Sequence, residues 1–122
     1  MSILPKLALG AALFTAGVAA GAAAEKTPAT EATTKIALEN ARVAVRVIDM
    51  APGASRPGRV RPTDELVLFC DEAHYQAVDA QGRKEPRDRA PGAVVFHHKG
   101  DVAPTLVNTS ARPIHYYGIS LK

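Results

Sequence analysis

The amino-acid sequence predicts a single all-β domain that follows a cleavable signal peptide. Its 122 residues are enough for one domain. Short apolar or alternating segments recur between turn-forming residues, which is typical of a β-sandwich or β-barrel. After residue 24, no window of ten or more residues has the periodicity of an amphipathic helix.

Composition narrows the class of protein further. The chain is 47% hydrophobic and 22% charged, as expected of a globular domain. Its 15 Lys and Arg residues only slightly outnumber its 12 Asp and Glu residues, so its charge gives no reason to expect a nucleic-acid partner. Cys70 is the only cysteine, which excludes an intramolecular disulfide. Since it ends an apolar segment, we expect Cys70 to be a buried structural thiol and not a nucleophile.

Residues 1–24 have the three parts of a signal peptide. Lys6 supplies a positive charge, residues 7–20 are apolar and uncharged, and Ala22-Ala23-Ala24 matches a small-residue cleavage site. The apolar run is shorter than the roughly 20 residues that span a membrane. We therefore expect cleavage after Ala24, a periplasmic or secreted bacterial protein, and no membrane anchor after cleavage.

The rest of the chain divides into a leader and a strand-rich domain. Residues 25–35 are polar and predict a flexible leader, so we expect the domain to occupy residues 36–122. Turns rich in Gly, Pro, Asp and Asn separate the expected strands, which are residues 42–48, 66–70, 74–78, 93–97, 105–107 and 114–121. Residues 83–89 mix both charges around Pro86 and predict a solvated loop.

The pattern within each strand predicts which residues form the core. Residues 42–48 alternate between two faces, whereas residues 66–70 form a continuous apolar run typical of a strand buried on both faces. We expect core contacts from the apolar positions of these and later strands, which are Val43, Val45, Val47, Leu66, Leu68, Val95 and Leu106.

Two spacing patterns point to a known family. Gly53 is followed after five residues by Arg59-Val60-Arg61, and after three more by Glu65. In the second half of the domain, Gly92, Gly100 and Asn108 are regularly spaced. These spacings resemble the two motifs of the cupin superfamily, of the small RmlC-like type. The resemblance implies a single cupin-type jelly-roll β-barrel.

The family's metal ligands are largely replaced. Cupins typically hold a metal with three histidines and one carboxylate, and the resemblance places Arg59 and Arg61 at two of the histidine positions. Only Glu65 survives from the ligand set, and a guanidinium has no lone pair to offer a metal. We therefore expect no cofactor. A rebuilt metal site from Glu65, His98 and His115 remains an alternative.

The arginines suggest a different function. If the register implied by the resemblance holds, Arg59 and Arg61 share one strand face near Glu65, where they could bind a carboxylate or phosphate. A structural ion pair with Glu65 is the other interpretation of the same residues. We expect an exported domain that binds a small molecule or an anion through Arg59, Arg61 and Glu65. We expect it to have no catalytic metal and no catalytic residue, and homodimerisation is one option for its assembly. The alternative is a metal-dependent cupin enzyme of the oxygenase, isomerase or decarboxylase type.

Overall fold

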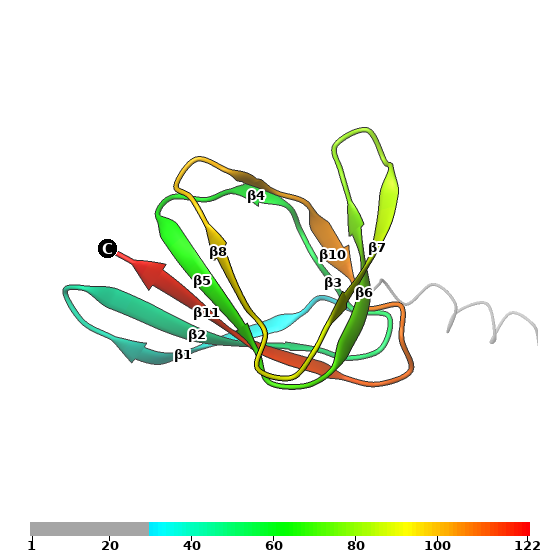
Figure 1. The fold of residues 1–122 in the computed structure, drawn as a ribbon, viewed down its shortest axis with the longest axis horizontal. Helices are drawn as coiled ribbons and strands as arrows, with labels where there is room; N and C mark the ends of the chain where they lie inside the picture. Colours follow the sequence, from blue (N-terminus) through cyan, green and yellow to red (C-terminus); the bar gives the residue numbers. More distant parts are fainter. Residues whose placement is uncertain (1–29) are drawn as a thin grey trace, which may run out of the picture.

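The computed structural model describes residues 30–122, and these form eleven strands and no helix (Figure 1). The expected signal peptide and residues 25–29 of the expected leader lie outside the described residues. The strands are β1 (Thr33–Glu39), β2 (Val43–Met50), β3 (Ser55–Arg56), β4 (Arg59–Val60), β5 (Asp64–Phe69), β6 (Ala73–Val78), β7 (Lys84–Arg89), β8 (Val94–His97), β9 (Val102–Ala103), β10 (Thr105–Val107) and β11 (Ile114–Leu121). None of the described residues forms a helix long and apolar enough to cross a membrane.

The strands pair antiparallel in three sheets. The larger sheet has the order β1-β2-β11-β5-β8, and the second has the order β3-β10-β6-β7. A short ladder of β4 and β9 joins them along one side (Figure 1). The last strand, β11, lies between β2 and β5, so the chain closes the fold by returning to its centre. The all-β class expected from the sequence is confirmed.

Two parts of the chain are more ordered than the sequence suggested. Strand β1 begins at Thr33, inside the segment expected to be a flexible leader, because its backbone pairs with β2 along its length. Residues 84–89 were expected in a loop but form β7, which pairs with all of β6. Pro86 does not prevent this, because β7 is an edge strand of its sheet and needs partners on one side only.

The core lies on the opposite face of β2 and β5 from the one that we expected. In β2, the residues that the barrel buries are Ala44, Ile48 and Met50, while the three valines of the strand lie on the outer face. In β5, Val67 and Phe69 are buried, and Leu66 and Leu68 are not. Both strands are apolar on both faces, so alternation could not indicate which face turns inward.

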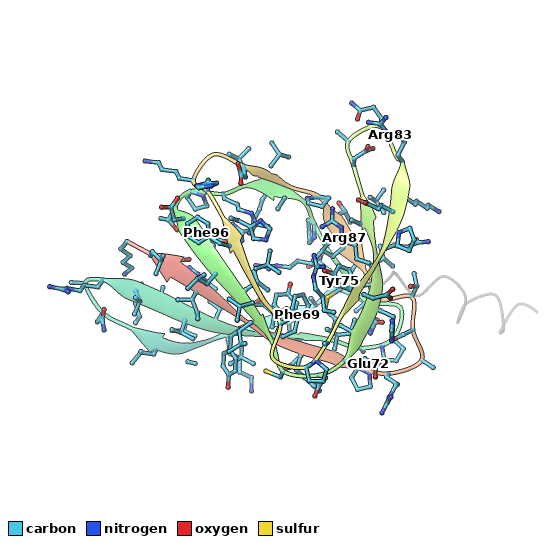
Figure 2. All side chains as sticks on the ribbon, in the orientation of Figure 1. Phe69, Glu72, Tyr75, Arg83, Arg87 and Phe96 are labelled. Carbon is cyan, nitrogen blue, oxygen red and sulfur yellow. The ribbon has the colours of Figure 1, made fainter. Side chains whose placement is uncertain are left out.

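The predicted contributions of Val95 and Leu106 are confirmed, since both pack against the buried cluster. Aromatic rings form its centre. Phe69 lies 5.3 Å from Tyr116 and 5.9 Å from Tyr75 between ring centroids. Figure 2 shows Phe69 and Tyr75 together inside the lower end of the barrel. These rings fill that end and leave the other end of the interior to polar side chains.

Asn108 holds the turn between β10 and β11 in place from inside the fold. Its side chain is fully buried and donates to the carbonyls of Met50 and Arg112 at 3.0 and 2.8 Å. Its Oδ1 accepts from both the backbone N–H and the hydroxyl of Ser110. A buried amide with all these partners stabilises the turn, which explains the role of an asparagine at this position.

Candidate ligand-binding site

The interior of the barrel contains a cavity of about 50 Å³, lined by side chains of both large sheets. Aromatic and aliphatic side chains form its floor, and basic side chains form its wall. The basic residues that line it are Arg56, Arg59, Arg61, Arg87, Arg89 and His97. Five arginines around so small a space give this site a strong positive charge.

Glu65 links two of these arginines. Arg59 donates to both of its carboxylate oxygens, at 2.8 and 3.2 Å, and Arg61 donates to Oε1 at 2.6 Å. Glu65 is 4% exposed and Arg61 is 8% exposed, so the pair is shielded from water. Burial raises the pKa of the Glu65 carboxyl, but the hydrogen bonds and charges of Arg59 and Arg61 outweigh it and hold the pKa below its usual range.

The backbone fixes the position of Arg61. Its N–H donates to the carbonyl of Asp101, and its carbonyl accepts from the N–H of Gly100, so it extends the ladder of β4 and β9. Gly58, just before β4, lets the chain pass close to β9, because a Cβ at this position would lie 2.6 Å from the carbonyl oxygen of Ala103. The structure thus places Arg59, Arg61 and Glu65 together, as their spacing suggested.

Two more arginines contact the aromatic floor. Arg56, on β3, donates to the hydroxyl of Tyr116 at 3.0 Å and lies 5.9 Å from the centre of its ring. Arg89, on β7, lies 6.0 Å from the centre of the Phe69 ring. Burial raises the pKa of the Tyr116 hydroxyl, although the nearby Arg56 opposes this shift, so the phenol stays protonated at neutral pH.

Sequence reasoning missed the arginines of β7. Arg87 and Arg89 are the half-buried residues of this strand, and both line the cavity. Figure 2 shows Arg87 inside the barrel opening and Arg83 at the outer tip of the hairpin between β6 and β7. The sequence held a signal that could have found them. Glu85, Arg87 and Arg89 are two residues apart, so in a strand they share one face, and every residue on that face is charged.

The positive charge of the cavity exceeds what the protein neutralises. Among the described residues, Glu65 and Glu85 are the only carboxylates within ion-pair distance of the five lining arginines, and Glu85 is an exposed partner of Arg87. Five positive charges less two negative charges leave three. In addition, the Nε atoms of Arg61 and Arg89 are buried without a hydrogen-bond partner in this part of the chain. A guanidinium nitrogen that is buried without a hydrogen-bond acceptor is stabilised by an anion beside it.

The histidines are arranged differently from the alternative metal set. His97 faces the cavity and pairs across the sheet with Glu65, whereas His98 is exposed. His115 lies on the outer face of the larger sheet, where its Nδ1 is 2.6 Å from Oδ1 of Asp49. Glu65, His98 and His115 therefore do not converge, because adjacent strand residues point to opposite faces and His98 points away from the barrel.

The side chains in the cavity also do not suit the metal that the fold family implies. His97 is the one imidazole among the described lining residues, and the Glu65 oxygens are engaged by guanidinium groups. No group of three or more His, Cys, Asp and Glu residues within residues 30–122 could hold a metal ion. Burial, aided by the charge of Arg61, lowers the pKa of His97, which keeps this ring neutral at pH 7.

Cys70 is exposed, which corrects the expectation of a buried thiol. It follows the last residue of β5, and its N–H donates to the carbonyl of His115. Partial burial and then the charges of Asp71 and Asp49 raise the pKa of its thiol. A raised pKa disfavours the thiolate, so the expectation that Cys70 is not a nucleophile is retained.

Comparison with known proteins supports the architecture. No family model and no curated protein matches the sequence. A cupin domain from Bordetella pertussis superposes with a TM-score of 0.71 at 17% identity, covering 79% of this chain and 98% of that one. This chain has a small cupin fold. The cupin match extends over nearly the whole length of that domain, so the likeness is to a complete barrel.

Two enzymes share this cupin fold. The polyketide cyclase RemF from Streptomyces resistomycificus has a TM-score of 0.62 at 16% identity, covering 76% of this chain and 66% of that one. The DMSP lyase DddQ from Ruegeria pomeroyi has a TM-score of 0.56 at 22% identity, covering 75% of this chain and 47% of that one. Identities this low show the shared fold and no shared activity.

Proposed function

We propose that this cupin barrel binds a small anionic molecule, carrying a carboxylate or phosphate group, in its arginine-lined cavity. The observation that carries the proposal is the surplus of positive charge around the cavity, together with the unpartnered Nε of the buried Arg61. A bound carboxylate or phosphate would accept hydrogen bonds from several guanidinium groups and neutralise part of that charge. Arg59 and Arg61 thus serve as binding groups, as the sequence suggested, and Glu65 orients them through its hydrogen bonds. Arg56, Arg87 and Arg89 join them around the cavity.

The dimensions of the site limit the ligand. A cavity of about 50 Å³ admits one carboxylate or phosphate group, since a single water molecule needs about 10–15 Å³. A more open groove next to it shares Arg59, Ala103 and Pro104 and is lined by Val60 and Val102. We therefore infer a ligand whose anionic group lies inside the barrel and whose uncharged remainder lies in the groove.

Titration calorimetry with phosphate and small carboxylates tests the proposal. We expect binding to wild type and a loss of about 2–5 kcal/mol of binding free energy in R61A, because Arg61 is buried. R87A is a second variant that is less apt to disturb the fold, since the Arg87 side chain is 31% exposed. R42A changes an exposed arginine outside the barrel and is the matched control. Absence of heat with wild type, or equal heats in R61A, R87A and wild type, would leave only the structural ion pair.

Catalysis is the second candidate function. The imidazole of His97 faces the cavity and stays neutral at pH 7, so it could accept a proton from a bound molecule. The fold itself supports catalysis in the polyketide cyclase and the DMSP lyase. Elemental analysis of the purified protein separates a metal-dependent enzyme from the binding domain. Stoichiometric iron, manganese, nickel or zinc would favour the enzyme.

We further propose that the domain is exported, on the basis of residues 1–24. Mass spectrometry of the exported protein should find Glu25 at its N-terminus. Replacing Leu13 with a charged residue in the apolar run should retain the protein in the cytoplasm, uncleaved. An exported protein that still begins with Met1 would contradict the proposed cleavage.

A further inference from the structure

The two larger sheets have four edge strands, which are β1, β8, β3 and β7. An edge strand has unpaired backbone N–H and C=O groups, and proteins ordinarily protect it with charges, prolines, bulges or a covering segment. Strand β1 has a bulge and two charged residues among its seven, and β7 has Pro86 and five charged residues. Strand β3 is covered by residues 30–32, which exchange hydrogen bonds with Ser55. Three of the four edges are thus protected.

Strand β8 is the edge that lacks these features. Its residues, Val94-Val95-Phe96-His97, include no proline and no Lys, Arg, Asp or Glu, and its register with β5 has no bulge. Among the described strands, none pairs with the side of β8 that faces away from β5. A regular, apolar edge of this kind is a template to which another extended segment can add as a strand.

The backbone groups of Val94 and Phe96 are the ones that this edge leaves free. The carbonyl of Ala93 accepts from the N–H of Phe69, so residue 93 turns its backbone groups toward β5. Successive residues of an antiparallel strand turn their N–H and C=O groups to opposite sides. Residues 95 and 97 therefore also turn toward β5, whereas residues 94 and 96 turn away from it. Their N–H and C=O groups are available to one added strand.

The same strand borders the arginine-lined cavity. Val95 and His97 line the cavity from β8, and Arg87 and Arg89 line it from β7. Strands β7 and β8 are edges of different sheets and do not pair with each other. Figure 1 shows them diverging from the turn at residues 90–93 that joins them. A strand added to β8 therefore runs beside the cavity, on the side to which the β7 arginines belong.

We propose that the domain also binds the C-terminal end of an extended peptide, which adds a strand to β8 and places its terminal carboxylate in the cavity. This inference rests on the proposed anion site, but the peptide reaches that site from the β8 side and not through the groove beside Arg59. A cavity of about 50 Å³ admits one anionic group and not a chain that continues, so the end of the peptide is the part that enters. Hydrogen bonds to the backbone of Val94 and Phe96 supply affinity, and the arginines select a free carboxylate.

Titration calorimetry with defined peptides tests the proposal. The probe is an N-acetylated pentapeptide of alternating valine and threonine that ends in valine with a free carboxylate, and acetylvaline is the reference for the carboxylate alone. We expect the pentapeptide to bind wild type at least roughly ten-fold more tightly than acetylvaline, because several main-chain hydrogen bonds add to the anion contacts. The same pentapeptide with a C-terminal amide should bind at least roughly ten-fold more weakly than the free acid, because it lacks the charge that the arginines bind.

Variants of Val94 separate the strand contact from the anion contact. V94P removes an N–H that faces away from β5, and an edge strand tolerates proline at such a position. It should weaken pentapeptide binding at least about three-fold and leave acetylvaline binding unchanged. V94T keeps the N–H and is the matched control, so it should bind both probes as wild type does. R61A should weaken the binding of both probes, and circular dichroism verifies that each variant folds.

The outcomes distinguish failure of the peptide site from failure of the anion site. Binding of acetylvaline with no gain for the pentapeptide overturns the peptide site and leaves the anion site intact, whereas absence of binding by either probe contradicts both. Equal pentapeptide affinity in V94P and V94T also overturns the peptide site. So does slow hydrogen exchange of the Val94 and Phe96 amides in the peptide-free protein, because another segment or a second copy would then cover this edge.

Discussion

Replacing Glu65 with glutamine tests whether the Glu65 carboxylate neutralises the charges of Arg59 and Arg61. E65Q keeps the size of the side chain and one oxygen acceptor, but removes the negative charge between Arg59 and Arg61. Glu65 is 4% exposed and accepts three hydrogen bonds from these two residues. The variant therefore leaves the charge of Arg61 buried without compensation, while the charge of Arg59, whose side chain is 33% exposed, is partly screened by water.

The expected loss of unfolding free energy follows from that geometry. Removing one partner of a buried ion pair costs about 3–5 kcal/mol. A domain of this kind has a total stability of about 5–15 kcal/mol, so the change is large enough to measure by urea denaturation. The matched control is E85Q, because Glu85 is a 69% exposed partner of Arg87, and its loss should cost about 0–1 kcal/mol.

The same variant connects stability to anion binding. With the carboxylate gone, phosphate should raise the stability of E65Q more than it raises the stability of wild type, because a bound anion replaces the missing charge. The assay is urea denaturation followed by circular dichroism, in chloride and in phosphate at equal ionic strength. A stability of E65Q within about 1 kcal/mol of wild type would refute the inference that Glu65 balances a buried charge. Equal phosphate effects in both proteins would refute the part that concerns the anion.

Lowering the pH should remove from wild type a contribution to the unfolding free energy that E65Q does not have. The pKa of Glu65 in the folded chain lies below the ordinary value of 4.5. Its contribution to stability is therefore present above pH 4.5 and is lost as the pH falls through the lower, folded pKa. Unfolding free energies measured from pH 6 downward should converge for wild type and E65Q. Parallel curves would contradict the assignment.

Three further predictions concern single side chains. N108A should lower the unfolding free energy by about 1–3 kcal/mol, measured by urea denaturation, because the buried carbonyl of Met50 loses its donor. G58A should lower it by about 1–3 kcal/mol, because a Cβ lies 2.6 Å from the Ala103 carbonyl oxygen, and an unchanged midpoint would show that the turn can move. In NMR titrations, His74 should titrate above pH 6.5, because its hydrogen bonds to Asp88 and Glu72 raise its pKa, while burial places His97 below 6.5. Phosphate should raise the pKa of His97 alone.

Six of the eleven strands and the charged motif could be predicted from the sequence, because both depend on local information. Turn residues mark where strands end, and each expected strand is present in the structure with small shifts of its ends. The spacing of Arg59, Arg61 and Glu65 places them within a single turn of chain, so their contact needs little long-range information. The cupin fold that the spacings suggested is the fold observed.

What the sequence alone determined is thus a single all-β domain with a basic motif beside one glutamate. Only the tertiary structure decided which face of β2 and β5 turns inward. Side chains alternate between the two faces of a strand, and both faces of these strands are apolar, so the sequence pattern fits either orientation. It also decided that Arg87 and Arg89 join Arg61 around one cavity. These residues are distant in sequence and belong to different sheets, so their meeting depends on how the sheets close, which no local pattern records. The outward position of the three valines of β2 follows for the same reason, since they were expected in the core and the closed barrel leaves them outside.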